Sequence, residues 1–211
     1  MPDYSLETGL GAAEGRIVIG LDEAGRGPWA GPVVAGAAWL DPDKLTPELL
    51  SSLDDSKKLS RAARETVLTA LEAAPRAAVR LAVGQASVGE IDRLNILQAS
   101  LLAMARAAEA LGLAADAALV DGNREPALTC PATCVVKGDG RSWSIAAASI
   151  LAKVTRDRQM ATLARRYPGY GWERNQGYGT AEHQAALARL GVTAEHRRSF
   201  RPIREALTLT S

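Results

Sequence analysis

The feature that most constrains this chain is a glycine-rich turn between two apolar runs near the N-terminus. Residues 16–21 (RIVIGL) and 32–40 (PVVAGAAWL) are rich in small and β-branched side chains, and GLDEAGRG occupies residues 20–27. Apolar runs bounded by glycine are typical of neighbouring β-strands. The sequence therefore predicts two adjacent strands, with the acidic pair Asp22 and Glu23 at the end of the first.

The remaining apolar patterns extend this pair into an α/β or α+β sheet domain. Three more strands are predicted, at 77–88, 117–122 and 133–137. Helices are predicted at 55–74, 90–111, 142–167 and 181–189, with a glycine- and aromatic-rich loop after Pro168. The small residues of the helix at 142–167 predict close packing against the sheet. Only residues 1–14 and the last few residues are expected to be disordered.

Basic residues are concentrated in the C-terminal quarter of the chain. Residues 153–204 hold eleven Lys and Arg against four Asp and Glu, a net charge of +7, whereas residues 1–152 hold fourteen against nineteen, a net charge of −5. An acidic body joined to a basic quarter suits a polyanion that is held in one place and processed in another. On charge alone, a solvated arginine-rich helical surface explains the pattern equally well.

The composition does not indicate a membrane or secreted protein. No apolar stretch approaches the roughly 18 residues of a membrane span, and the N-terminus lacks the basic start and apolar block of a signal peptide. A cytoplasmic location is therefore expected. Cys130 and Cys134 are the only cysteines and neither histidine lies near them in sequence, so we expect ordinary thiols rather than a zinc site.

Acidic residues mark the ends of three predicted strands. Asp22 ends the first strand, Asp121 ends the fourth, and Asp139 lies just past the fifth. If these strands are neighbours, the three carboxylates converge on one edge with Glu23 beside them. Like charges a few ångströms apart raise one another's pKa, and a divalent cation resolves that conflict. Oxygen ligands without a His and Cys set favour Mg²⁺ or Mn²⁺ over zinc.

The glycines after the acidic pair support the interpretation that Asp22 and Glu23 belong to a metal site. Successive strand side chains face opposite ways, so Asp22 and Glu23 serve one site only if the chain bends or Glu23 uses its long side chain or its carbonyl. Gly25 and Gly27 permit such a bend, and Arg26 adds a cation for a phosphate or an acidic neighbour. Taken alone, an acidic pair of this kind is more often a hairpin turn with solvated charges.

The chain resembles the ribonuclease HII family, the type 2 ribonucleases H, from about Arg16 to Ile203. The matching blocks are GLDEAGRGPWAGPVVAGA at 20–37, DDSKKLS at 54–60, VDGN at 120–123, VKGD at 136–139, SIAAASILAKVTRDRQM at 144–160, YPGYGWERNQGYGT at 167–180 and HRRSF at 196–200. The resemblance implies a ribonuclease H-like fold with a mixed five-stranded sheet flanked by helices. Residues 15–165 would form the catalytic domain, and 166–211 a basic, mostly helical substrate-binding extension.

The resemblance also implies the site residues and the substrate. Two divalent ions, Mg²⁺ or Mn²⁺, would be held by Asp22, Glu23, Asp121 and Asp139, the catalytic residues. A sensor for the RNA 2′-hydroxyl is placed in Gly25, Arg26, Gly27 and Tyr178. Candidate phosphate contacts are Ser56, Lys57, Lys153 and Arg156, with Asn95 as a weaker case. The implied substrates are RNA–DNA hybrids and duplex DNA that contains single ribonucleotides, cut to leave 5′-phosphate and 3′-hydroxyl ends by an enzyme expected to be a monomer. No sliding-clamp motif is seen at the C-terminus.

Three other interpretations remain open from the residues. Another ribonuclease H-like nuclease, such as a resolvase, would share the carboxylates but lack the sugar sensor. A nucleic-acid-binding module would use them structurally. An aspartyl phosphatase is expected to show a DxD spacing after the first strand, which DEAG does not. His183 and His196 are expected to have surface or packing roles rather than to act as catalytic bases, and most of the tryptophans, Trp29, Trp143 and Trp172, to fill the core.

Overall fold

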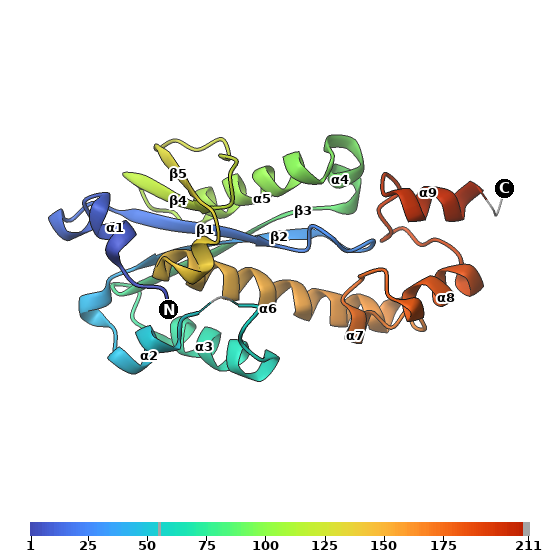
Figure 1. The fold of residues 1–211 in the computed structure, drawn as a ribbon, viewed down its shortest axis with the longest axis horizontal. Coiled ribbons are helices and arrows are strands. Elements are labelled where there is room, and N and C mark those ends of the chain that lie inside the picture. Colours follow the sequence, from blue (N-terminus) through green and yellow to red (C-terminus); the bar gives the residue numbers. More distant parts are fainter. Residues whose placement is uncertain (55, 209–211) are drawn as a thin grey trace.

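The five predicted strands form one mixed sheet in the order β3-β2-β1-β4-β5 (Figure 1). The structure, a computed structural model, describes residues 1–54 and 56–208. The strands are β1 Val18–Ala24, β2 Val33–Leu40, β3 Val79–Ala86, β4 Ala117–Asp121 and β5 Ala132–Val135. β2 is antiparallel to both β1 and β3, whereas β4 is parallel to both β1 and β5. The predicted mixed five-stranded sheet is thus confirmed.

Helices cover both faces of this sheet. They are α1 Ser5–Gly9, α2 Pro47–Ser52, α3 Arg61–Ala73, α4 Val88–Leu94, α5 Ile96–Ala110, α6 Trp143–Arg166, α7 Trp172–Asn175, α8 Ala181–Leu190 and α9 Arg201–Thr208, with 3₁₀ turns η1 Ala12–Glu14, η2 Pro42–Lys44 and η3 Gly138–Gly140. Figure 1 shows α4 and α5 on one face, α6 and α3 on the other, and α7 to α9 at one end. Within the part of the chain that the structure describes, none of these helices has the length and apolar character that crossing a bilayer requires.

The long helix α6 lies directly on the backbone of the two central strands. A Cβ atom at Gly20 of β1 would stand 2.2 Å from the carbonyl carbon of Ser144, and one at Gly36 of β2 would stand 2.2 Å from the carbonyl oxygen of Ala148. Only glycine leaves room for this approach. The prediction that a small-residue helix packs closely against the sheet is confirmed.

The predicted helix at 90–111 is two helices, which corrects the sequence prediction. Asn95 adopts a φ of 71°, outside the helical region, and separates α4 from α5. Its side-chain oxygen accepts a hydrogen bond from the backbone N–H of Gln98 at 3.1 Å, so Asn95 caps α5. The apolar periodicity continues across the break, which is why the sequence pattern alone indicates one helix.

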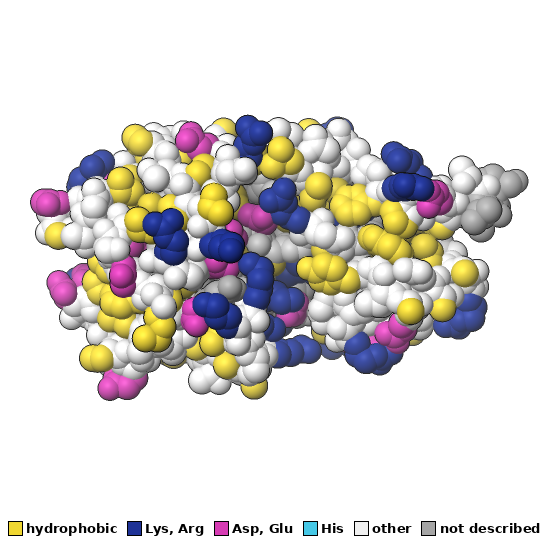
Figure 2. Space-filling view, viewed as in Figure 1, with side chains coloured by type: hydrophobic (Ala, Val, Ile, Leu, Met, Phe, Trp, Pro, Cys, Tyr) yellow, Lys and Arg dark blue, Asp and Glu magenta, His cyan; other side chains and the backbone are white. Residues whose placement is uncertain are grey.

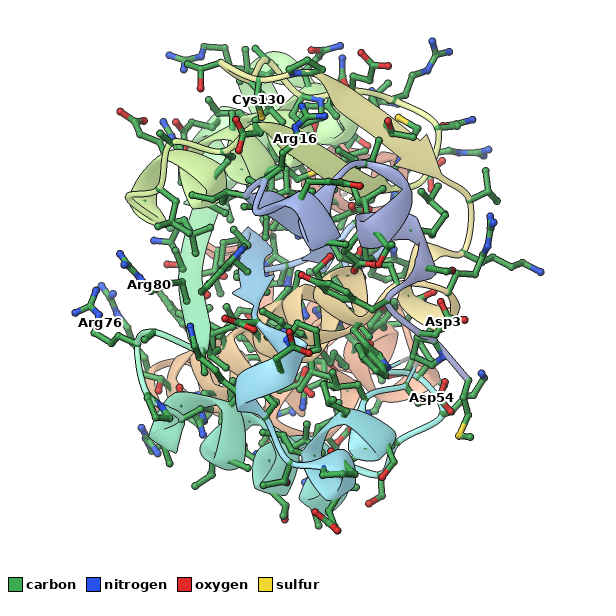
Figure 3. The ribbon with its side chains drawn as sticks, turned by 90° about the vertical axis from the view of Figure 1, so that its left-hand side faces the viewer. Asp3, Arg16, Asp54, Arg76, Arg80 and Cys130 are labelled. Atoms are coloured by element: carbon green, nitrogen blue, oxygen red, sulfur yellow. The ribbon has the colours of Figure 1, made fainter. Side chains whose placement is uncertain are left out.

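The N-terminal segment is ordered, which corrects the expectation of disorder for residues 1–14. It contains α1 and η1, and the backbone of Asp3 bonds to Arg141 and Trp143, at 3.3 Å and 3.0 Å. Glu7 is fully buried; its Oε1 atom accepts hydrogen bonds from Ser142 Oγ at 2.6 Å, Ser144 N at 2.9 Å and Ser144 Oγ at 2.7 Å. Figure 3 views this end of the molecule, with Asp3 on the opposite side from Arg76. Residues 209–211 lie outside the described residues.

The C-terminal segment carries the helices α7, α8 and α9. Helix α8 matches the predicted 181–189, whereas the one-turn helix α7 lies inside the segment predicted as a loop. Met160 and Ala164 of α6 share a hydrophobic cluster with Tyr170 and the fully buried Trp172. The core role expected for Trp172 is confirmed, Trp143 packs at the edge of another cluster, and the half-buried Trp29 lies against His183. The division at residues 165 and 166 stays a prediction.

Candidate functional site

The register of β1 and β4 brings two acidic side chains to the same level of the sheet. Their parallel pairing runs to Leu21 opposite Val120, so Asp22 and Asp121 follow at equivalent positions. Strand alternation places both on the face that carries α6. β1 continues to Ala24 through its pairing with β2, so Asp22 and Glu23 are the fifth and sixth of its seven residues, near the end of the strand, as the sequence predicts.

Asp139 joins these residues from the 3₁₀ turn after β5. The amide N–H of Gly138, in the same turn, donates to Oδ1 of Asp121 at 2.7 Å. The Nζ atom of Lys57 lies 3.2 Å from Oδ2 of Asp139, which is 3% exposed. The carboxyl ends of β1 and β4 and the turn after β5 therefore bring the predicted acidic residues to one region of the sheet edge.

A cleft of about 300 Å³ opens at this region, in the face drawn in Figure 2. Its lining contains most of the predicted site residues together with two others, Ala24 and Ser149: Asp22, Glu23, Ala24, Gly25, Arg26, Gly27, Ser56, Lys57, Asp121, Ser149, Lys153, Arg156 and Tyr178. Asp139 is not in the lining but is linked to it through Lys57. Figure 2 shows Lys and Arg side chains gathered over the middle of this face, with acidic side chains between them.

The carboxyl groups of the cleft resist ionisation. Burial raises the pKa of Asp22 well above its ordinary value, and the charges of Glu23 and Asp121 raise it further. Burial also raises the pKa of Glu23, against the lowering effect of Arg26. For Asp121, burial raises the pKa while the hydrogen bond from Gly138 opposes the shift. Each of these carboxyl groups would be more easily ionised with additional positive charge nearby.

The donor atoms fit a hard divalent cation. They are carboxylate oxygens, which Mg²⁺ and Mn²⁺ prefer, and a bound cation would offset both the burial and the mutual repulsion that raise the pKa values of Asp22 and Asp121. Within residues 1–54 and 56–208, no group of three or more His, Cys, Asp and Glu is already gathered in a metal-binding arrangement. Lys57 pairs with Asp139, and Arg26 pairs with Glu23 at 3.3 Å, so side-chain cations neutralise two of the carboxylates.

Two buried arginines hold the loop that follows the acidic pair. The guanidinium of Arg156 donates to the carbonyls of Ala30, Pro32 and Gln176 at 3.0–3.2 Å. Arg197 donates to the carbonyls of Gly25, Arg26, Gly31 and Pro32 at 2.6–3.1 Å. Burial lowers the pKa of Arg156 to about 10 and that of Arg197 to about 9, so both remain charged at neutral pH.

These contacts refine the interpretation of Arg156 as a phosphate ligand. Its side chain reaches the cleft, yet each of its three guanidinium nitrogens is already bonded to a carbonyl. It therefore acts on the cleft by fixing the loop. Gly25 has a φ of 98°, and a Cβ atom there would stand 1.9 Å from Nε of Arg156, so this position requires glycine. Sequence reasoning missed Arg197, although it lies in the HRRSF block.

Tyr178 reaches the same cleft from the C-terminal segment. The residue is 47% exposed, and a Cβ atom at Gly27 would stand 3.3 Å from Cε1 of its ring. The backbone N–H of Tyr178 donates to the carbonyl of Asn175 at 2.9 Å. The structure thus brings the predicted sensor residues together from segments about 150 positions apart in the sequence.

The remaining predicted contacts have different surroundings. The hydroxyl groups of Ser56 and Ser149 are 2.9 Å apart, and Lys153 pairs with Asp157 at 2.7 Å. Ser149 was missed by sequence reasoning, although its spacing of four from Lys153 would have placed it on the same face of α6. Asn95 is not in the lining of the cleft, because it lies at the junction of α4 and α5.

Comparison with known proteins gives consistent results. The family model described as Ribonuclease HII matches residues 19–203. The curated Ribonuclease HII of Rhodospirillum rubrum is 62% identical over 98% of this chain and 92% of its own length. Among solved structures, ribonuclease H2 from Pyrococcus horikoshii OT3 has a TM-score of 0.71 at 26% identity, over 91% of this chain and 97% of its own. Bst-RNase HIII in complex with Mn²⁺ has a TM-score of 0.73 at 22% identity, over 93% and 70%, which shows a shared fold.

Proposed function

Because this chain belongs to the ribonuclease HII family, we propose that it incises duplex DNA on the 5′ side of single embedded ribonucleotides in addition to degrading hybrids. As a family member it is a ribonuclease H, a hydrolase that cleaves the RNA of RNA–DNA hybrids. The finer proposal concerns how few ribonucleotides the site requires. Such an activity would serve ribonucleotide excision repair and DNA replication.

The observation that carries the proposal is the composition of the cleft. The glycines of the DEAGRG loop and the ring of Tyr178 line the same cleft as Asp22 and Asp121. RNA differs from DNA in its sugar by the 2′-hydroxyl, so a sensor must combine hydrogen-bonding groups close to the scissile phosphate. Backbone groups at Gly25 and Gly27 can bond that hydroxyl, and the Tyr178 ring can stack on the following deoxyribose.

The acidic residues would hold the metal ions. We assign Asp22, Glu23, Asp121 and Asp139 as ligands of two divalent ions, Mg²⁺ or Mn²⁺. When bound, such ions would supply activation of the attacking water and neutralisation of the leaving oxygen, and the expected products are a 5′-phosphate and a 3′-hydroxyl. The family depends on divalent metal. In this chain the hydrogen bond from the Gly138 amide to Oδ1 of Asp121 would hold that ligand against the turn that carries Asp139.

Exposed cations around the cleft would bind the phosphates on either side of the cut. The side chain of Lys57 is 77% exposed, that of Arg26 is 51% exposed, and Lys153 lines the same cleft. Ser56 is a further candidate through its hydroxyl. Contact by Asn95, a monomeric state, the lack of a clamp partner and a cytoplasmic location remain proposals.

The decisive experiment is gel mapping of the products from three duplexes. One contains a single ribonucleotide, one is all DNA and one is a continuous RNA–DNA hybrid. We expect incision of the first on the 5′ side of the ribonucleotide and cleavage of the third. Cleavage of the hybrid alone would overturn the single-ribonucleotide proposal, and cleavage of all three would favour a nonspecific nuclease. Tyr178→Ala should reduce incision at the lone ribonucleotide more than it reduces Mn²⁺ affinity.

A further inference from the structure

Two histidines form a buried pair behind the cleft. His183 of α8 and His196 are 0% and 1% exposed, and their Nε2 atoms are 3.1 Å apart. The rings of Tyr170 and Trp172 pack edge-on against them. Neither histidine lines the cleft. The packing role expected for them is confirmed, but it does not explain why two imidazoles face each other through the same nitrogen.

The backbone around the pair determines which nitrogen of each ring carries a proton. The carbonyl of Tyr178, 2.9 Å from Nδ1 of His183, can only accept, so that Nδ1 carries the hydrogen. The amide of Thr193, 2.9 Å from Nδ1 of His196, can only donate, so that nitrogen accepts and Nε2 of His196 carries the hydrogen. His196 therefore donates to His183 across the 3.1 Å contact.

This arrangement holds both rings in the neutral form. Nε2 of His183 also accepts from the indole N–H of Trp172 at 3.1 Å. A second proton on His183 would sit on Nε2, where it would meet the N–H groups of Trp172 and His196. A second proton on His196 would sit on Nδ1, where it would meet the amide N–H of Thr193. Burial lowers the pKa of both histidines, and that of His196 to about 4.

The pair connects the two halves of the sensor. At one end, Nδ1 of His183 bonds the carbonyl of Tyr178. Gly179, which follows Tyr178, lies against the ring of Trp29, and a Cβ atom at Gly179 would stand 2.0 Å from that ring. At the other end, His196 forms a bridge with Ala30 and precedes Arg197, which holds the DEAGRG loop. The hydrogen-bonded path therefore runs from Tyr178 to the segment that carries Gly25 to Gly27.

We propose that His183 and His196 are positioning residues that fix Tyr178 relative to the DEAGRG loop, and so set discrimination at the sugar without contacting the substrate. This inference rests on the proposed function of Tyr178 as part of the sensor. The pair acts through its hydrogen bonds to the Tyr178 carbonyl and the Thr193 amide. Its effect therefore depends on which ring nitrogen carries the hydrogen, and not on the volume of the rings alone.

The tautomers are tested first, in the wild-type chain, by ¹⁵N NMR of the imidazole rings at neutral pH. We expect a neutral Nδ1–H ring for His183 and a neutral Nε2–H ring for His196. Either ring in the other tautomer, or charged at neutral pH, overturns the inference. This measurement needs no substrate, so its outcome is independent of whether single ribonucleotides are incised.

Two substitutions at one position then separate positioning from packing. His183→Asn can place an amide N–H near the position of Nδ1 and keep the bond to Tyr178, whereas His183→Gln can keep an acceptor near Nε2 but loses that bond. We expect His183→Gln to lower kcat/KM for the single-ribonucleotide duplex by about three- to tenfold, the range for loss of one hydrogen bond. His183→Asn should lose less, and Mn²⁺ affinity should be equal in both.

The comparison with the continuous hybrid decides the outcome. A larger loss on the single-ribonucleotide duplex than on the hybrid, in His183→Gln only, supports the inference. Equal losses on both substrates, or equal losses in both variants, overturn it in favour of a packing role. If His183→Gln does not fold, His196→Gln keeps an N–H toward His183 and is compared with His196→Asn by the same ratio. Failure of the wild-type chain on the single-ribonucleotide duplex would instead overturn the proposed function.

Discussion

The Nζ atom of Lys57 lies 3.2 Å from Oδ2 of Asp139, so a solvent-exposed lysine neutralises a buried carboxylate that we assign to the metal site. The lysine side chain is 77% exposed and the aspartate side chain 4%. A metal ion and this ammonium group would therefore compete for the same oxygen.

Replacing Lys57 by Met should raise Mn²⁺ affinity while weakening substrate binding. The substitution removes the competing charge but keeps an unbranched side chain. The gain should be about two- to fivefold, since pairs with an exposed partner contribute at most about 1 kcal/mol. Calorimetric titration with Mn²⁺ measures it, and Lys58→Met serves as the matched control from the same segment. Lower Mn²⁺ affinity in the Lys57 variant would contradict competition.

Asp121→Asn should abolish cleavage and stabilise the metal-free protein. The pKa of Asp121 is raised above 3.8 by burial, so its contribution to stability is fully present below pH 3.8 and is lost as pH rises through the folded-state pKa. The amide does not titrate. At neutral pH we expect a melting temperature about 2–4 °C higher, equivalent to about 1 kcal/mol in a chain of this size. A thermal melt in chelator measures the expected gain in stability, and a cleavage assay in saturating Mg²⁺ measures the expected loss of activity. Retained turnover would contradict the assignment of Asp121 as a metal ligand.

Substrate affinity should fall steeply as salt concentration rises. Lys and Arg contacts to phosphates release counterions, and each contact contributes about 0.9 to the slope of log K against log salt for a DNA duplex. Lys153→Ala should weaken binding of all sequences alike and reduce that slope by about 1. Anisotropy titrations at several salt concentrations in Ca²⁺ measure it. An unchanged slope would remove Lys153 from the phosphate contacts, although its pairing with Asp157 would remain.

The histidine pair should make stability sensitive to mild acid. The pKa of His196 falls from 6.5 to about 4 on folding, so its contribution is present above pH 6.5 and is lost between pH 6.5 and about 4, where the unfolded chain binds a proton that the folded chain does not. At 1.36 kcal/mol per pKa unit the loss should reach roughly 3 kcal/mol. Urea unfolding across this window measures it. His196→Gln cannot titrate, so an equal pH dependence in the variant would assign the effect to other groups.

Glu7→Ala should destabilise the fold and weaken metal binding together. The substitution removes the acceptor for Ser142 and Ser144, and leaving a buried donor without its partner costs about 1–3 kcal/mol. Ser142 lies three residues after Asp139, so the loss should also loosen η3 and lower Mn²⁺ affinity. Glu7→Gln retains an acceptor and should lose less of both. A stability loss with unchanged Mn²⁺ affinity would limit Glu7 to a structural role.

Local sequence patterns were sufficient to predict the five strands and the acidic residues near their ends, whereas the order of the strands, which brings those residues together, was not contained in them. Apolar runs and glycines are local patterns that span only a few residues, so they were enough to place the five strands. The positions of Asp121 and Asp139 at the sheet edge follow from where β4 and β5 end. The extension of β1 to Ala24 could not be placed, because it depends on the register with β2. The break at Asn95 was hidden because the apolar period continues on both sides of it.

The contacts that fix the site could not be predicted, because their partners are distant in sequence. Arg156 was assigned to phosphate from its block, whereas its guanidinium serves carbonyls at Ala30 and Pro32. Glu7 lies in a segment without strong periodicity, and only its burial against Ser142 identifies it. The charges and motifs of the sequence therefore indicated where the candidate site lies. The long-range hydrogen bonds that hold its residues in place are visible only in the structure.

The anchoring of Glu7 has a consequence for the order in which the protein can form during synthesis. Its partners Ser142 and Ser144 are 135 and 137 positions later, so the carboxylate leaves the ribosome long before anything can bury it. One edge of β1 also waits, because its parallel neighbour β4 begins only at Ala117. The β1–β2 pair can form early, whereas the parallel half of the sheet and the burial of Glu7 must wait for β4 and α6, so a nascent chain stalled before Ser142 should lack both the buried carboxylate and the fixed turn at Asp139.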